Sequence, residues 1–164
     1  PPGVKLDSGG LGKGLAADRA AARLPASIRY VIGLGGDLAV GGDWPVAVIG
    51  AFGGNEVHRL RVVRGGVATS GIATRIWSGP DGAPAHHLID PVTGAPAWTG
   101  VVAATAVAPT ALEAEVIAKA AALSGPRAAR RLLRRRGGVL QYDSGHVEAI
   151  EPAPVVRLPR VAVA

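Results

Sequence analysis

A glycine-rich segment near the start of the chain is the first place where this sequence could bind a phosphate. Gly9 to Gly14 lead directly into a helical pattern, and N–H groups at the start of a helix attract anions. The segment is not a Walker-type nucleotide loop, because the spacing before Gly12-Lys13 is wrong and neither Gly14 nor Leu15 offers a hydroxyl to magnesium. A plainer interpretation is that these glycines let the chain pass close to a neighbouring segment. The loop alone leaves both interpretations open.

Two adjacent histidines form the second chemical feature. As neighbours in extended backbone, His86 and His87 point to opposite faces and cannot hold one metal ion together. One of them could carry a proton or ligate an ion while the other packs. The following segment, Asp90 to Gly94, has the composition of a turn stabilised by the aspartate side chain.

Carboxylates are spread along the chain. Glu115 and Lys119 have the i,i+4 spacing of a helical ion pair, which at a surface contributes about 0.2–0.5 kcal/mol. Three aspartates stand beside glycines or helix starts, where helix capping is the expected role. They are Asp7, Asp18 and Asp37.

Charge and composition exclude several classes of protein. The chain lacks cysteine, which excludes disulfides, thiolate metal sites and a cysteine nucleophile. The net charge of +6 comes from one arginine cluster, since the other charges balance, and no aromatic residues interleave with it to stack bases. We therefore interpret the cluster as a solvated helix face rather than a polyanion-binding patch, and expect no nucleic-acid partner. Its members are Arg127, Arg130, Arg131, Arg134, Arg135 and Arg136.

The chain of 164 residues fits one domain, and 48% hydrophobic residues suffice for a core. Because only 4% of the residues are aromatic, that core must consist of Ala, Val, Leu and Ile. No apolar run reaches the length of a membrane-spanning helix, about 20 residues. The start at Pro1-Pro2-Gly3, in a sequence without methionine, suggests a processed chain or a fragment.

Three segments have helical periodicity. The second, residues 109–123, begins with Thr110 as N-cap and Glu113 three residues later, which is a capping box. The others are residues 11–24 and a short basic helix over 127–135. The apolar face expected for the first helix consists of Leu15, Ala16, Ala20 and Leu24.

Strand patterns alternate with these helices without regular βαβ spacing. The expected strands are residues 28–34, 45–50, 57–63, 101–107, 138–142 and 146–150. In the third, Val57, Arg59, Arg61 and Val63 share one face. Arg64-Gly65-Gly66 should end it, and a polar loop should run from Gly71 to His86. We predict an α+β fold with a mixed or antiparallel sheet packed with helices, a core over residues 1–150 and an extended tail over 151–164.

The order of the motifs is more informative than any one of them. Taken together, five segments resemble the C-terminal half of the ApbE family, the FAD:protein FMN transferases. They are Asp7-Ser8-Gly9-Gly10-Leu11-Gly12-Lys13-Gly14 with Asp18-Arg19; Leu34-Gly35-Gly36-Asp37; Ala68-Thr69-Ser70-Gly71 with Arg75; His86 to Gly94; and Ala108 to Glu115.

The resemblance implies an ApbE-like (T-fold-like) fold that binds FAD and a divalent cation, usually magnesium. Such proteins cleave the diphosphate and pass FMN to a threonine hydroxyl of a target protein, forming a phosphoester. His87 matches the family histidine that assists proton transfer or orients the acceptor. The positions that match cofactor-binding motifs are Gly10, Gly12, Lys13, Asp37, Ser70, Gly71, Arg75, His87 and Thr93.

The resemblance also implies metal contacts at the Gly12 carbonyl and on the second helix. The family has an aspartate and, four residues later, a threonine where this chain has Glu115 and Lys119. A protonated lysine cannot ligate a cation. Either Lys119 replaces the metal as a fixed positive charge, or the protein binds flavin without transferring it, and magnesium dependence is in question.

The expected partners are FAD and an acceptor protein threonine. We also expect the remaining half of the FAD site to come from an N-terminal segment or a second chain. The composition, rich in Ala, Gly and Arg, suggests a bacterial source. The compartment stays open, since any export signal would lie upstream.

Overall fold

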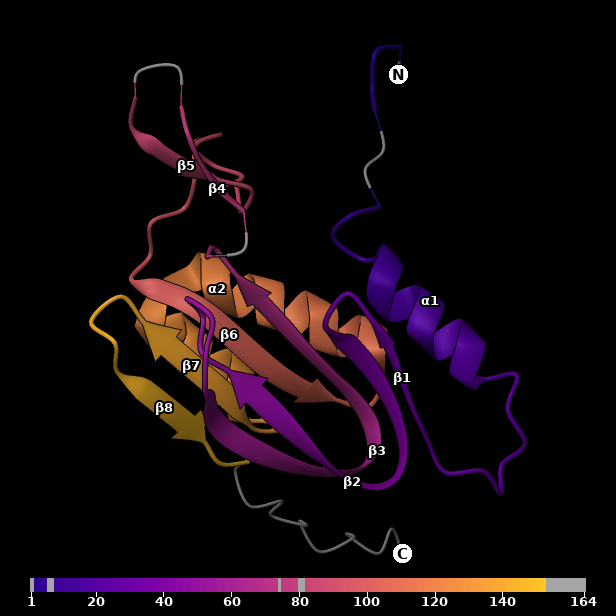
Figure 1. Ribbon diagram of the computed structural model, residues 1–164. Coiled ribbons are helices and arrows are strands. Elements are labelled where there is room, and N and C mark those ends of the chain that lie inside the picture. Colours follow the sequence, from indigo (N-terminus) through magenta and orange to yellow (C-terminus); the bar gives the residue numbers. More distant parts are fainter. Residues whose placement is uncertain (1, 6–7, 74, 80–81, 153–164) are drawn as a thin grey trace, which may run out of the picture.

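A six-stranded antiparallel sheet is the largest element of the computed structural model, which describes residues 2–5, 8–73, 75–79 and 82–152. Its strands lie in the order β1-β2-β3-β6-β7-β8, with both helices on one face (Figure 1). The bounds are β1 Tyr30–Leu34, β2 Asp37–Ile49, β3 Glu56–Gly71, β6 Val101–Ala108, β7 Gly138–Tyr142 and β8 Val147–Ile150. The helices are α1 Gly12–Ala21 and α2 Ala111–Leu133. The predicted α+β class is confirmed.

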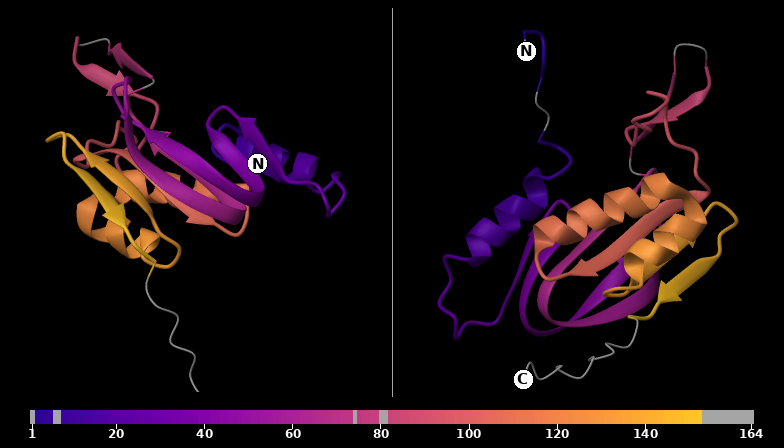
Figure 2. Two further views of the ribbon diagram at one scale, coloured as in Figure 1. Left: turned by 60° about the horizontal axis from the view of Figure 1, so that its bottom comes forward. Right: turned by 180° about the vertical axis from the view of Figure 1, so that it is seen from behind.

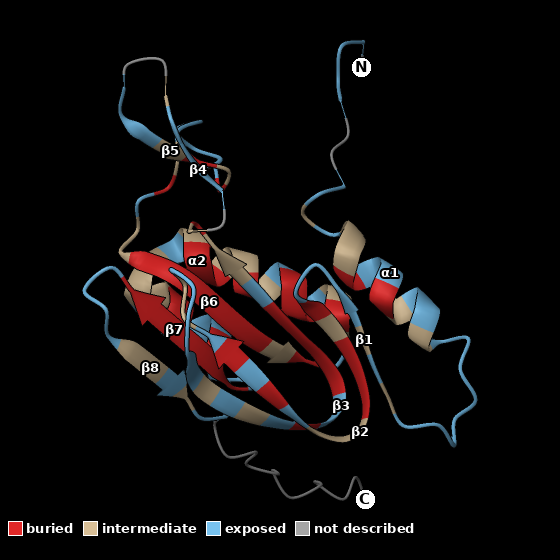
Figure 3. Cartoon of the chain, in the orientation of Figure 1, coloured by how far each residue is buried: buried red, intermediate tan, exposed pale blue. Residues whose placement is uncertain are grey.

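The face expected for the first helix was wrong. The buried residues of α1 are Gly14 and Ala17, whereas Leu15 is 47% exposed and Leu24 is 37% exposed. Small residues face inward because α1 lies directly against α2 and the sheet, where larger side chains would hold the helices apart. Figure 3 shows the outer face of α1 largely exposed. None of the described helices is long and apolar enough to cross a membrane.

Both helices predicted for the second half of the chain are present, joined into α2. Thr110 accepts a hydrogen bond from the Glu113 N–H at 3.1 Å, which confirms the predicted N-cap. Gly125 interrupts the helical backbone with φ 72° and ψ 171°, at the predicted boundary between the two helices. Figure 2 shows α2 running across the sheet, with its two halves in different directions.

Strand β3 continues through the segment that was expected to end it. Gly65 has φ +135°, and a Cβ placed on Gly66 would lie 2.3 Å from the backbone nitrogen of Ala111. The glycines are therefore required by the crossing of the α2 start over β3, and they do not break the strand. Earlier in the same strand, Val57, Arg59, Arg61 and Val63 are exposed together, as predicted.

The segment expected to be a polar loop contains a small hairpin, β4 Ile76–Ser78 with β5 Pro84–His86, which projects from the body of the molecule (Figure 1). Strands this short carry little periodicity for a sequence pattern to show. The predicted hairpin of β7 and β8 is confirmed. Of the predicted tail, Glu151 and Pro152 lie outside any helix or strand, and its remaining residues, like Asp7, lie outside the described residues.

The core consists of small aliphatic side chains, as the composition required. Strands β6 and β7 are almost entirely buried (Figure 3), and alanines of α2 pack on β6 and β3. A smaller core cluster contains Val40, Val46, Val62 and Val67. The tip of the β2–β3 hairpin is tied to β7 through the Gln141 side chain, which accepts from the Ala51 N–H at 2.7 Å and donates to the Ile49 carbonyl at 3.0 Å.

The first turn of α1 packs unusually closely on the start of α2. A Cβ on Gly14 would lie 2.6 Å from the Ala111 carbonyl oxygen. One turn later, the Asp18 carboxylate accepts hydrogen bonds from the N–H groups of Ala111 and Leu112 at 2.8 and 2.9 Å. Asp18 therefore caps a helix, as predicted, but that helix is α2 rather than its own.

Gly14→Ala is expected to destabilise the protein by about 1–3 kcal/mol, because backbone atoms of α2 must move to admit the methyl group. The measurement is the free energy of unfolding in urea. Gly12→Ala is the matched control in the same turn, since its Cβ would meet only the Ser8 side chain at 3.4 Å. Equal stability of the two variants would contradict the close contact.

Asp18→Ala is expected to lower the free energy of unfolding by about 1–2 kcal/mol, the usual cost of losing a helix cap. Asp43→Ala serves as control, because the Asp43 carboxylate pairs with the exposed Arg61 side chain at the surface. An equal decrease in the free energy of unfolding for both variants would contradict the capping of α2 by Asp18.

Candidate functional site

Two buried carboxylates lie next to the start of α1. Asp37 and Glu115 are each 1% exposed, although they come from β2 and α2. The Lys13 ammonium lies 2.5 Å from Asp37 Oδ2 and 3.6 Å from Glu115 Oε1. Burial raises the pKa of Asp37, and the hydrogen bond from Lys13 opposes that rise. Asp37 thus neutralises a cation and does not cap a helix.

A second ammonium reaches the same group. Lys119 donates to the Gly10 carbonyl oxygen at 2.7 Å, and its Nζ lies 3.9 Å from Glu115 Oε1. The other oxygen of Glu115 accepts from the Gly14 N–H at 2.9 Å. The spacing of Glu115 and Lys119 suggested a surface pair, but the carboxylate is buried at the α1–α2 contact. We call Lys13, Asp37, Glu115 and Lys119 the charged cluster.

Several amides of the glycine-rich loop are engaged within the chain. The N–H groups of Leu11 and Gly12 donate to the Ser8 carbonyl at 3.0 and 2.7 Å, and that of Gly14 donates to Glu115. An anion at this helix start would therefore meet the ammonium groups of Lys13 and Lys119, whose side chains remain 41% and 27% exposed. Both interpretations of the loop have support: Gly14 serves close packing, and the lysines give the region positive charge.

The two histidines differ in burial, as expected for neighbouring side chains that point to opposite faces. His86 is fully buried, with its ring edge-on to that of Trp98 at 4.5 Å between centroids. His87 is half-buried, and its pKa is lowered by burial first and then by the charges of Arg75, His86 and Lys119. Of these charges, that of Lys119, a member of the charged cluster, has the smallest effect on the pKa of His87.

Three further predicted site residues, Ser70, Gly71 and Thr93, make their described contacts outside the charged cluster. Ser70 and Gly71 end β3, opposite Ala104 and Ala103 of β6. Thr93 accepts from the Ala95 N–H at 3.3 Å within its own turn. Across the described ranges, no hydrogen bond joins the side chain of Ser70 or Thr93 to the charged cluster, and the roles of all three residues stay predictions. The Asp90 carboxylate accepts from the Val92 N–H at 2.8 Å, which confirms the expected turn.

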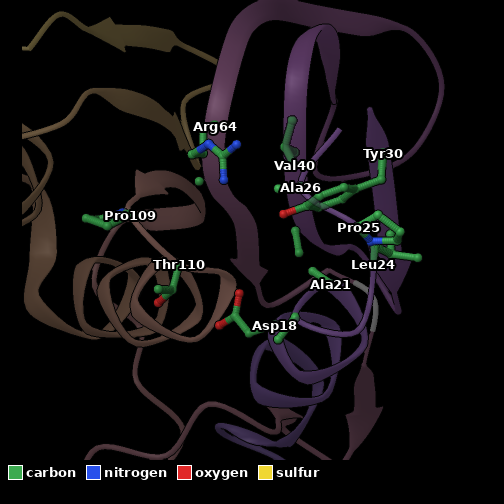
Figure 4. A pocket seen from close by; sticks show the side chains of 13 residues that line it. Asp18, Ala21, Leu24, Pro25, Ala26, Tyr30, Val40, Arg64, Pro109 and Thr110 are labelled. Atoms are coloured by element: carbon green, nitrogen blue, oxygen red, sulfur yellow. The ribbon is translucent and has the colours of Figure 1, made fainter. Parts of the chain in front are cut away.

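A cavity of about 380 Å³ lies between α1, β1 and β2 and the start of α2, with Tyr30 and Arg64 among its walls (Figure 4). A second cavity of about 200 Å³ is lined by Trp98 and Asp143. Neither of these two cavities is lined by the charged cluster or by His87.

Comparison with known proteins agrees with this arrangement of motifs. The sequence model of the ApbE family matches residues 1–142. The chain belongs to the ApbE family. It is 34% identical over 146 residues to an FAD:protein FMN transferase of Escherichia coli K12, covering 83% of this chain and 41% of that one. A transferase of the same description from Treponema pallidum is 33% identical over 155 residues, covering 84% and 42%.

Solved structures of ApbE proteins share the fold. The ApbE protein of Thermotoga maritima superimposes with a TM-score of 0.79 at 29% identity, over 92% of this chain and 52% of that one. The flavin transferase ApbE of Vibrio cholerae gives a TM-score of 0.72 at 22% identity, covering 91% and 52%. The chain spans about two fifths of the length of the curated relatives it matches.

The divalent cation that the ApbE resemblance implies does not fit the residues of this chain. Glu115 Oε1 faces two ammonium groups, and the Gly10 carbonyl already accepts from one of them. The described residues include no group of three or more His, Cys, Asp or Glu side chains placed to hold a metal ion. A hard cation needs several free oxygen ligands. The metal contacts predicted at Gly12 and Glu115 therefore lack the surroundings that magnesium requires.

Acidification is expected to destabilise this ApbE protein through His86. Burial lowers the pKa of His86 below its usual 6.5, so the unfolded chain binds more protons between these two values and stability falls as the pH drops below about 6.5. His86→Phe, which keeps a ring against Trp98, should flatten this part of the profile. Urea unfolding between about pH 8 and pH 5 measures it. An unchanged slope in the variant would contradict the assignment.

Proposed function

We propose that this chain contributes the diphosphate-binding part of a flavin transferase, which cleaves FAD and attaches FMN to a threonine of a target protein. The main support is the charged cluster, in which the ammonium groups of Lys13 and Lys119 lie beside the glycine-rich start of α1 and remain partly exposed. His87 is a half-buried imidazole that could accept a proton. The printed names of the relatives, FAD:protein FMN transferases, support the same reaction.

In the proposed reaction the threonine oxygen bonds to the phosphorus of the FMN half of FAD. The bond from that phosphorus to the bridging oxygen breaks, and AMP leaves with this oxygen and its electron pair. The hydroxyl proton passes to the His87 imidazole. Burial keeps the pKa of His87 low, so the imidazole is neutral near pH 7 and can accept this proton. Catalysis by the chain consists of positioning and charge compensation.

The other predicted residues would act on the ligand rather than on the transferred proton. Lys13 and Lys119 offer positive charge to the diphosphate, while Asp37 and Glu115 hold these ammonium groups in place. Arg75 adds a third cation near His87. We assign Gly10, Gly12, Ser70, Gly71 and Thr93 to the walls of the FAD site, as the ApbE motifs imply.

The rest of the FAD envelope is proposed to come from a preceding protein segment or from a second chain. The support is the coverage of the relatives, of which this chain matches about two fifths. An acceptor protein with an exposed threonine completes the set of partners.

A second candidate is a flavin-binding member of the family without transfer activity. The observation that favours it is the ion pairing of Glu115 with Lys119, at the positions where the resemblance implies metal ligands. Mass spectrometry of an acceptor peptide incubated with FAD separates the two. A mass increase by FMN supports transfer, whereas FAD binding without modification, under every divalent cation tried, supports the second candidate.

His87→Ala is expected to reduce the transfer rate about 10²–10⁴-fold with little change in the unfolding midpoint, because the variant loses the proton acceptor. In the unmodified protein the rate should rise with pH as His87 loses its proton, below its usual pKa of 6.5. His58→Ala, on the β2–β3 hairpin, is the control histidine. A full transfer rate in His87→Ala would remove the imidazole from the mechanism.

A further inference from the structure

Two lysine ammonium groups lie on the oxygen atoms that a divalent cation would need. Lys119 Nζ is 2.7 Å from the Gly10 carbonyl oxygen and 3.9 Å from Glu115 Oε1, and Lys13 Nζ is 3.6 Å from the same Oε1. This carboxylate oxygen is buried and, within the described ranges, accepts no hydrogen bond. The ammonium groups of Lys13 and Lys119 therefore attract Glu115 Oε1 by their charge, and this attraction holds both lysine side chains in place.

A magnesium ion at this position would meet unfavourable surroundings. It takes about six oxygen ligands at about 2.0–2.1 Å. At Glu115 it would share Oε1 with two positive groups, whose repulsion at such distances is strong in a partly buried site. The Asp37 carboxylate also faces a cation, because its Oδ2 pairs with Lys13 at 2.5 Å, while its buried Oδ1 has no hydrogen-bond partner among the described residues.

The same ammonium groups have capacity left for a ligand. An ammonium has three N–H donors, and the contacts described above use no more than two on either lysine. Both side chains are partly open to solvent, 41% for Lys13 and 27% for Lys119. Gly10 leaves the room that Lys119 needs, because a Cβ there would lie 3.1 Å from its Nζ.

Resting on the function proposed above, we propose that Lys13 and Lys119 take the place of the divalent cation and bind the FAD diphosphate directly. FAD binding by this chain is then independent of magnesium. Lysine binds phosphate as a point charge and needs no particular coordination geometry, which suits this substitution.

The test is the Kd for FAD, measured by flavin fluorescence in excess EDTA and in excess Mg²⁺. The wild-type protein should bind equally in both buffers, within about twofold. Lys119→Met should weaken binding about tenfold or more in both. Lys119→Thr, which frees the Gly10 carbonyl and Glu115 Oε1, should bind weakly in EDTA and regain affinity with Mg²⁺.

Two controls separate charge at the site from net charge and from folding. Arg131→Met removes one positive charge from the second half of α2, beyond Gly125, and should bind FAD like the wild type. Lys119→Arg keeps the charge and should retain most of the affinity without Mg²⁺. Thermal unfolding identifies any variant that does not fold. If a variant fails to fold, the proposal is tested by the wild-type Kd in the two buffers, with the metal content of the protein measured by mass spectrometry.

The outcomes distinguish this proposal from the proposed function. Wild-type binding of FAD that requires Mg²⁺, or full affinity in a folded Lys119→Met, overturns the lysine proposal and leaves flavin transfer standing. Magnesium-independent FAD binding without FMN transfer supports the lysine proposal and overturns the transferase. Absence of FAD binding in both buffers, when the segment or chain that completes the FAD site is present, overturns both.

Discussion

The close approach of the first turn of α1 to the start of α2 is the constraint on which the site depends. Gly14 has no side chain to keep the helices apart, so its N–H reaches Glu115 and Asp18 reaches the first amides of α2. The same contact buries the Glu115 carboxylate. A buried charge needs compensation, and Lys13 and Lys119 provide it. The packing of α1 on α2 therefore also determines where the charged groups of the site lie.

This arrangement explains why charged groups are buried in an otherwise aliphatic molecule. Buried ion pairs add little net stability, because the desolvation of both partners offsets their attraction. The role of Asp37 and Glu115 is to position the long, flexible side chains of Lys13 and Lys119 beside the start of α1. Rigidly placed cations lose less entropy when an anionic ligand arrives than mobile ones do.

Several features encoded by local sequence were predicted correctly, although the short β4–β5 hairpin was missed, and features that depend on distant contacts were not predicted. The alternation over residues 57–63 and the Thr110 cap are visible within one turn or strand. The buried face of α1 was misjudged, because Leu15 looks like a core residue until α2 is known to lie close by. The pairing of Lys13 with Asp37, 24 residues away, and the capping by Asp18, 93 residues away, leave no local pattern. The order of the motifs identified the family, which the spacing of single residues did not, and the roles of the site residues stay predictions.

The amide of Gln141 has a consequence for how the chain folds. It joins β7 to the tip of the β2–β3 hairpin across 90 and 92 residues of sequence. During synthesis, the hairpin tip emerges from the ribosome long before the strand that secures it. Such long-range closures slow folding and leave strand edges open to other chains in the meantime. The tip of the β2–β3 hairpin is thus expected to become ordered late in folding and to need protection by chaperones until β7 is in place.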